Sequence, residues 1–111
     1  MTQLIDEKKV TASTKLINAK NVTIIPNSRA EHSIYTYSTK VDTYADIKSA
    51  AFYNPLYTFF AVGDILRIFK YDKDGLTTYY ELVAVDVDKL NKKVTMAILV
   101  EKNVKKSIIG E

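Results

Sequence analysis

Apolar and polar residues alternate along most of the second half of the chain. Three segments show the alternation, ILRIFKYD, LTTYYELVAVD and VTMAILV, which begin at Ile65, Leu76 and Val94. A period of two residues is typical of a β-strand that lays one face on a core. Polar turn residues interrupt the alternation at 72–75 and at 87–93. The pattern therefore predicts an antiparallel three-strand meander within residues 59–100.

Residue types add two details to this meander. Gly63, between Val62 and Asp64, allows a tight entry into the first strand, and Gly75 allows a positive φ in the hairpin turn. Strict alternation in the last strand predicts that one face carries Val94, Met96, Ile98 and Val100.

The first half of the chain has shorter strand patterns. Residues 21–26 and 32–38 are rich in β-branched and aromatic side chains, which fit a pleated surface. Pro26 ends the first of them because proline cannot donate a hydrogen bond to a neighbouring strand. Two short strands are predicted here.

The period changes to that of a helix after residue 42. Thr43 is an N-cap with Asp46 three residues later, an acidic variant of the capping box. Asn54 precedes Pro55, and the residue before a proline avoids the helical region. The sequence predicts one short helix over about 44–53, which needs a surface to lie on.

The two ends of the chain lack such patterns and are predicted to be extended. We expect an N-terminal arm over 1–19, a β-rich domain over 20–100, and a C-terminal tail or edge strand over 101–111. A chain of 111 residues holds a single core. The predicted fold class is mainly β, a small antiparallel sandwich or barrel-like meander with one short helix and extended terminal arms.

Composition excludes several classes of function. The chain has no cysteine, which removes disulfides, thiolate nucleophiles and cysteine metal sites. The formal net charge of +3 is too small to indicate a nucleic-acid surface unless the basic residues cluster. No apolar run is long enough to span a bilayer, and the first residues lack the order of a signal peptide. We expect synthesis and assembly in a cytoplasm, with no membrane partner.

Candidate chemistry is sparse. His32 is the single histidine, and no nucleophile-elbow motif accompanies it, so a surface position in a strand is favoured over catalysis. Asp72, Asp74 and Gly75 resemble the start of a calcium loop, but Val83 stands where the loop needs Glu, which favours a hairpin turn. We expect no enzyme activity, no cofactor and no metal.

Aromatic residues are concentrated around the predicted helix and the first hairpin. Phe and Tyr alternate with basic residues in RIFKYDKDGLTTYYEL, from Arg67, and bases of single-stranded nucleic acid stack on such rings. A half-buried sheet uses the same residues for packing. A small β-barrel that binds single-stranded nucleic acid therefore remains the alternative function, although a nucleic-acid partner is not favoured.

One part of the chain resembles small structural proteins of tailed bacteriophages. The similar region, about 40 residues from Tyr44 to Val85, has a short helix with an alanine pair, an aromatic pair and Asn at its end, then VGD, a strand, a DG turn and a second strand. The matching residues are Ala50 to Asn54, Val62 to Asp64, Asp74 to Gly75 and Tyr80 to Val85. The chain departs from the commonest form of this pattern in its richness in Tyr and Lys.

The resemblance implies a role in the virion. It implies a non-enzymatic, capsid-associated protein, a decoration, auxiliary or head-fibre-like subunit, that contacts the major capsid protein or other virion proteins. It also implies a homo-oligomer, with a trimer favoured.

We expect contacts with other subunits through the arms and an apolar face of the sheet. The crowded aromatic residues at 52–60 are expected to pack the short helix onto the sheet, and some of them to contact a partner as well, because one small core is not expected to absorb all of them. The candidates for partner contacts are therefore these aromatic residues and apolar residues of the arms. They are Leu4, Ile5, Val10, Leu16, Ile17, Phe52, Tyr53, Tyr57, Phe59, Phe60, Ile108 and Ile109.

Overall fold

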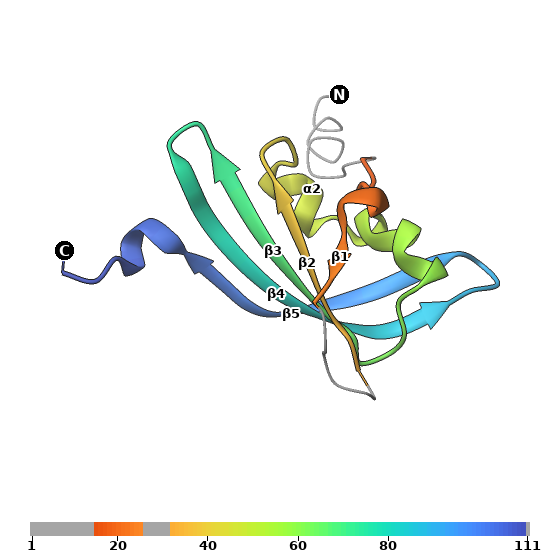
Figure 1. Ribbon diagram of the computed structural model, residues 1–111. Helices are drawn as coiled ribbons and strands as arrows, with labels where there is room; N and C mark the ends of the chain where they lie inside the picture. Colours follow the sequence, from red (N-terminus) through yellow and green to blue (C-terminus); the bar gives the residue numbers. More distant parts are fainter. Residues whose placement is uncertain (1–14, 26–31, 111) are drawn as a thin grey trace, which may run out of the picture.

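A single β-sheet organises the molecule in a computed structural model, which describes residues 15–25 and 32–110 (Figure 1). The described strands lie in the order β1-β2-β3-β4-β5, with β2 parallel to β3 and every other pair antiparallel. They are β1 (Thr23–Ile24), β2 (Ile34–Thr39), β3 (Ile65–Asp72), β4 (Gly75–Asp88) and β5 (Lys93–Asn103). The predicted β-rich fold and the meander β3-β4-β5 with its two turns are confirmed.

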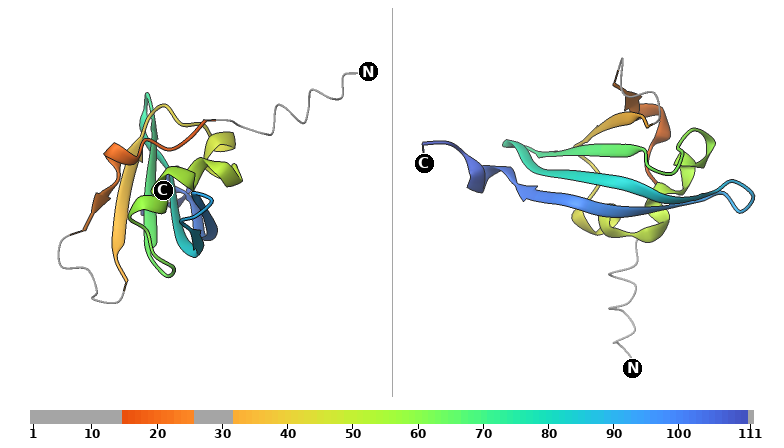
Figure 2. Two further views of the ribbon diagram at one scale, coloured as in Figure 1. Left: turned by 90° about the vertical axis from the view of Figure 1, so that its right-hand side faces the viewer. Right: turned by 90° about the horizontal axis from the view of Figure 1, so that it is seen from below.

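Helical elements form the second layer, where the sequence predicted a sandwich or barrel. The described elements are η1 (Ala19–Asn21), α2 (Tyr44–Lys48), η2 (Ala50–Thr58) and η3 (Val104–Ser107). Helices α2 and η2 connect β2 to β3 and lie on one side of the sheet (Figures 1 and 2). A crossover of this kind is what two consecutive parallel strands require.

The helix begins as predicted and ends differently. Thr43 Oγ1 accepts from the Asp46 N–H at 3.2 Å, and Asp46 Oδ2 accepts from the Thr43 N–H at 2.8 Å, so the capping box is present. The α-helix stops at Lys48, because Ser49 has an extended backbone. A 3₁₀-helix, η2, then continues through Pro55, which was predicted to end the helix.

Pro55 is tolerated because a distant residue replaces its missing hydrogen bond. In a 3₁₀-helix the N–H of residue 55 would donate to the carbonyl of Phe52, and proline has no N–H. The backbone N–H of Ile17 donates to that carbonyl instead, at 2.8 Å. This bond ties the start of the described chain to the helical layer.

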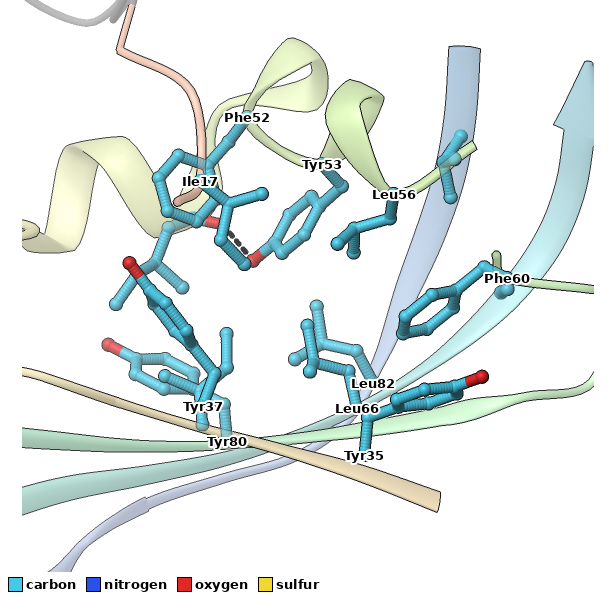
Figure 3. Close-up of a cluster of buried hydrophobic side chains, with 14 residues drawn as sticks. Ile17, Tyr35, Tyr37, Phe52, Tyr53, Leu56, Phe60, Leu66, Tyr80 and Leu82 are labelled. Carbon is cyan, nitrogen blue, oxygen red and sulfur yellow. Dashed lines mark hydrogen bonds between the residues drawn. The ribbon is translucent and has the colours of Figure 1, made fainter. Parts of the chain in front are cut away.

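The core lies between this layer and the covered face of the sheet (Figure 3). Two cross-strand rows supply the sheet side, with Tyr35, Leu66 and Leu82 in one and Tyr37, Ile68 and Tyr80 in the other. Phe52, Tyr53, Leu56 and Phe60 point toward these rows from η2 and the loop after it, and Ile17 lies among them. The Tyr53 hydroxyl donates to the Ile47 carbonyl at 2.7 Å, so its polar end is paired inside the core.

The faces of β5 differ from the predicted alternation because the ladder contains irregularities. Leu82 pairs with Ile98 but Glu81 pairs with Val100, which leaves Leu99 as an extra residue. Val100 therefore lies on the face opposite Ile98, although the sequence predicted that they share a face.

A buried carboxylate joins the entry of β3 to the neighbouring strands. Asp64 Oδ1 accepts from the Ser33 N–H at 3.0 Å and Oδ2 accepts from the Ala61 N–H at 2.9 Å. Gly63, predicted to allow a tight entry into this strand, takes a φ of 96°, and its N–H donates to the Ala84 carbonyl at 2.8 Å. The VGD segment is thus a structural junction.

A second buried carboxylate moves the boundary of the predicted N-terminal arm. Asp42 accepts hydrogen bonds from the hydroxyls of Tyr37 and Thr39 and forms an ion pair with Lys15, whose Nζ lies 2.7 Å from Oδ1. Ile17 is 3% exposed within the core. Residues 15–19 therefore belong to the β-rich domain, and the rest of the predicted arm lies outside the described residues.

Asp64→Asn is expected to lower the free energy of unfolding by about 1–3 kcal/mol. One of the two carboxylate oxygens would become an amide NH₂ facing a backbone N–H, which leaves a buried donor unpaired. Urea denaturation measures the change, with Asp74→Asn in the exposed hairpin turn as the matched control. Equal stabilities of the two variants would contradict the structural role of Asp64.

Buried tyrosines predict a loss of stability at alkaline pH. Burial raises the pKa of Tyr37 to about 12, with the Asp42 carboxylate adding to the effect, and burial raises the pKa of Tyr80 to about 12. Unfolded tyrosine has a pKa of about 10, so the stabilisation is complete below pH ~10 and is lost as the pH rises to ~12. Urea titrations should show the free energy of unfolding falling steeply over this interval. A level profile up to pH ~12 would contradict the burial of these hydroxyls.

Candidate functional site

The face of the sheet turned away from the helices is the main candidate for function. The view from below in Figure 2 looks onto its strands, with the helical layer behind them. We call it the open face. Its residues alternate with those of the buried rows, and they are Ile34, Thr36, Ser38, Ile65, Arg67, Phe69, Tyr79, Glu81, Val83, Ala97, Val100 and Lys102.

One complete row of the open face is apolar. The cross-strand pairs run from Ile34 to Ile65, from Ile65 to Val83 and from Val83 to Ala97. All four side chains are only half-buried. Strands that are apolar on both faces are typical of sheets covered on both sides. The composition of this row therefore makes it the candidate for a contact surface.

The middle of the open face contains a polar group within apolar surroundings. The Tyr79 hydroxyl donates to Glu81 Oε1 at 3.0 Å, and Arg67 Nε lies 3.9 Å from the same oxygen, beyond hydrogen-bond distance. Burial and then the bond to Glu81 raise the pKa of Tyr79. Phe69 contacts the Tyr79 ring, with centroids 5.1 Å apart. The open face therefore presents a carboxylate and a guanidinium, which can orient a bound molecule, next to two aromatic rings, which can provide apolar contact area.

The C-terminal tail extends the open face at one corner. Tyr79, Val100 and Lys102 line a shallow hollow of about 460 Å³ together with residues of the tail, Val104, Ile108 and Ile109. Ile109 is 97% exposed. An exposed isoleucine beside an apolar hollow is typical of an interaction surface.

The structure divides the predicted contact residues into three groups. Four of them, Ile17, Phe52, Tyr53 and Phe60, lie in the core of their own chain and are excluded from a partner surface. Phe52, Tyr53 and Phe60 pack η2 and the loop after it onto the sheet, as expected, but none of the four is available to a partner, because η2 and the sheet absorb more apolar area than expected. Others are accessible, with Leu16, Phe59, Ile108 and Ile109 exposed and Tyr57 half-buried. Leu4, Ile5 and Val10 lie outside the described residues.

Sequence reasoning expected contacts through the arms and an apolar face of the sheet, but it did not identify the residues that form this face. The individual contact candidates that it named lie in the arms and in the aromatic cluster near η2. A signal was present in ILRIFKYD and LVAVD, in which Ile65, Phe69 and Val83 make the solvent-side positions apolar as well. Apolar residues at both alternating positions indicate a strand with two contacting faces.

Acidic residues of the two hairpins accept hydrogen bonds within their own turns. Asp72 Oδ1 accepts from the Asp74 N–H at 2.7 Å, and Gly75 has a φ of 113°, which makes 72–75 the predicted hairpin turn. Asp88 accepts from the backbone and side-chain nitrogens of Asn91, which lowers the pKa of Asp88. These carboxylates shape loops.

Within the described residues, no cluster of three or more His, Cys, Asp and Glu side chains is placed to bind a metal ion. His32 is exposed beside Gly63. In the same part of the chain, no helix has the length and hydropathy needed to cross a membrane.

Comparisons with known proteins give no further information on this site. No family profile matches the chain, and neither the curated proteins nor the solved structures contain a significant match.

Proposed function

We propose that the protein is a non-enzymatic structural subunit that acts through protein–protein contacts made by its open face. The observation that supports this proposal is the apolar row from Ile34 to Ala97, which the described residues leave uncovered. The resemblance to tailed-phage structural proteins supports a capsid-associated place in a virion, as a decoration, auxiliary or head-fibre-like subunit. Its partner is then the major capsid protein or another virion protein.

The dimensions of the open face suit such a contact. Five strands spaced ~4.8 Å apart make the sheet roughly 20 Å wide, and a run of six residues is also roughly 20 Å long. The product of these lengths is about 400 Å², about half of the roughly 800 Å² that each partner gives to a standard interface, so a partner of standard size would also cover the hollow at the C-terminal tail and surface beyond it. The central Arg67 and Glu81 would fix the orientation of the partner, because a charged pair inside an apolar patch rejects a mismatched surface.

Val83→Asp tests the proposal, because it places a charge in the apolar row without changing the covered face of the sheet. We expect its copy number in purified particles, relative to the major capsid protein by quantitative mass spectrometry, to fall at least tenfold. Val41→Asp is the control, since Val41 is exposed and lies outside the open face.

Two further measurements make that result decisive. Circular dichroism and urea denaturation establish that Val83→Asp is folded, and Ile65→Lys is a second open-face variant if it is not. Light scattering on the purified chain tests the proposed trimer. Particles that lack the protein altogether, or that contain Val83→Asp and Val41→Asp equally, would contradict the proposed function.

Binding of single-stranded nucleic acid is the second candidate, and one observation favours it. The Phe69–Tyr79 ring pair lies on the open face between Arg67 and Lys102, which resembles a stacking platform with basic neighbours. Glu81 lies in the same patch and accepts from Tyr79 at 3.0 Å, so the patch contains a carboxylate that repels phosphate.

Fluorescence anisotropy with a labelled oligothymidine separates the two candidates. Phosphate contacts release counterions, so nucleic-acid binding weakens steeply as salt is raised. We expect no binding at physiological salt and no difference between the unmodified chain and Phe69→Leu. Salt-dependent binding that Phe69→Leu and Lys102→Ala both weaken would favour the nucleic-acid function instead.

A further inference from the structure

The hollow beside the C-terminal tail, which we call the tail hollow, has mostly aliphatic walls. Val100 on β5 and Val104, Ile108 and Ile109 on the tail line it, and the Tyr79 ring on β4 completes the apolar lining. Its volume of about 460 Å³ falls within the range of about 300–1,000 Å³ that is usual for ligand pockets. Ile108 is 51% exposed and Ile109 is 97% exposed. These walls are therefore accessible to an apolar side chain from another molecule.

Three lysines surround these walls. Lys102 lines the tail hollow, and Lys105 and Lys106 lie on η3 between two lining residues, Val104 and Ile108. All three lysines are exposed, and within the described residues none of them forms an ion pair. The residues that line the hollow include no acidic side chain. The rim of the tail hollow is therefore positive.

The glutamates of β4 and β5 do not neutralise this rim, because each already has a basic partner. Glu101 forms an ion pair with Lys48 on α2, with Nζ and Oε1 2.9 Å apart. Glu81 forms an ion pair with Arg67 on the open face, with Nε and Oε1 3.9 Å apart. The charge of the three rim lysines therefore remains available to a partner.

The charge and the shape of the tail hollow decide which occupant fits. A second copy of the tail would bring its own three lysines against this rim, and like charges repel. A nucleic-acid base stacks on flat rings, whereas the walls contain one ring, Tyr79, and four aliphatic side chains. An amphipathic membrane anchor needs a helix of several turns, whereas η3 has 4 residues. A polypeptide with both carboxylates and a large apolar side chain matches the rim and the walls together.

We propose that the tail hollow binds an acidic segment of a partner protein, with one large apolar side chain of that segment in the hollow and its carboxylates paired with the lysine rim. The inference rests on the proposed function and deepens it, because it names the chemistry of the partner at one corner of the contact surface. Burial of the apolar side chain supplies affinity, and the charges steer the partner and fix its orientation.

Synthetic peptides test the proposal on the full chain. The probe is GEDLFEDG, the charge control is GKKLFKKG, and the apolar control is GEDSSEDG. In NMR titrations of the isotope-labelled chain at low salt, the acidic probe should bind, and both controls should bind at least roughly tenfold more weakly. Equal affinity for the probe and for either control would overturn the proposal.

The same titrations locate the bound peptide. Backbone amide signals of residues 100–109 and of Tyr79 should shift, because these residues form the tail hollow and its rim. Signals of β1 and of the turn between β4 and β5 should stay in place. Shifts that omit residues 100–109 would overturn the proposal.

Charge-reversal variants test the lysine rim. The double variant Lys105→Glu with Lys106→Glu should weaken binding of the acidic probe at least roughly tenfold. The matched control, Lys89→Glu with Lys92→Glu, reverses two exposed charges at the opposite end of β5 (Figure 2) and should change affinity less than roughly twofold. An equal loss in both double variants would assign the binding to net charge and overturn the proposal.

A pair of serine variants tests the apolar wall. Ile109→Ser should weaken binding of the acidic probe at least roughly threefold, because it removes apolar area that the probe covers. Leu90→Ser is the matched control, since Leu90 is 88% exposed and lies in the turn between β4 and β5. Both positions are exposed, so both variants keep the core, which their NMR spectra verify. Unchanged affinity of Ile109→Ser, or an equal loss in Leu90→Ser, would overturn the proposal.

Other occupants of the tail hollow are outcomes of the same experiment. Labelled oligothymidine, or vesicles of phosphatidylcholine with phosphatidylserine, would have to shift the signals of residues 100–109 while the acidic probe does not. A second copy would shift these signals as the concentration of the chain is raised, with a dimer in light scattering. We expect none of these results, and each would overturn the proposal.

The open-face variant separates this inference from the proposed function. Val83→Asp should bind the acidic probe within roughly twofold of the unmodified chain, because Val83 does not line the tail hollow. If the probe fails to bind the unmodified chain while Val83→Asp is still lost from particles, the inference on the tail hollow is wrong and the proposed function stands.

Discussion

The parallel pairing of β2 with β3 is the constraint on which the rest of the structure depends. Six residue pairs, from Ile34–Ile65 to Thr39–Lys70, align these strands in the same direction. A chain that leaves one end of β2 must travel the length of the sheet before it enters β3. Residues 40–64 make that return on one side, and they supply α2 and η2, the helices that cover the core face of the sheet.

Buried polar groups hold this crossover at both ends. Asp42 accepts from two hydroxyls and pairs with Lys15 just after β2, and Asp64 accepts from two backbone N–H groups just before β3. Between them, the carbonyl left free by Pro55 accepts from Ile17. If the helices moved away from the sheet, these bonds would break and leave buried acceptors without donors, which is unfavourable. The bonds therefore hold the helices in place.

The location of the helices on one side of the sheet has a consequence for function. The crossover absorbs the aromatic residues of η2 into the core, so the side chains that remain accessible are those of the open face and the tail. The open face therefore exists because a crossover on one side of the sheet leaves the other side without a covering layer among the described residues.

Sequence alone determined the features that depend on near neighbours. The strand character of β3, β4 and β5, the positive φ of Gly75, and the capping box of Thr43 with Asp46 all arise within a few residues of chain. Each was predicted correctly, because the physical cause is local backbone geometry or a contact between close positions.

Tertiary structure alone decided the features that depend on distant partners. Pro55 continues a helix because Ile17 supplies a donor, Val100 changes face because β4 and β5 pair with an extra residue at Leu99, and the open face exists because the helices occupy the other side. Of the candidate contact residues, burial excluded four, and the apolar row was found only once the strands were placed in register. A sequence pattern shows which positions share a face, but which face receives a covering layer is set by contacts between segments far apart in the chain.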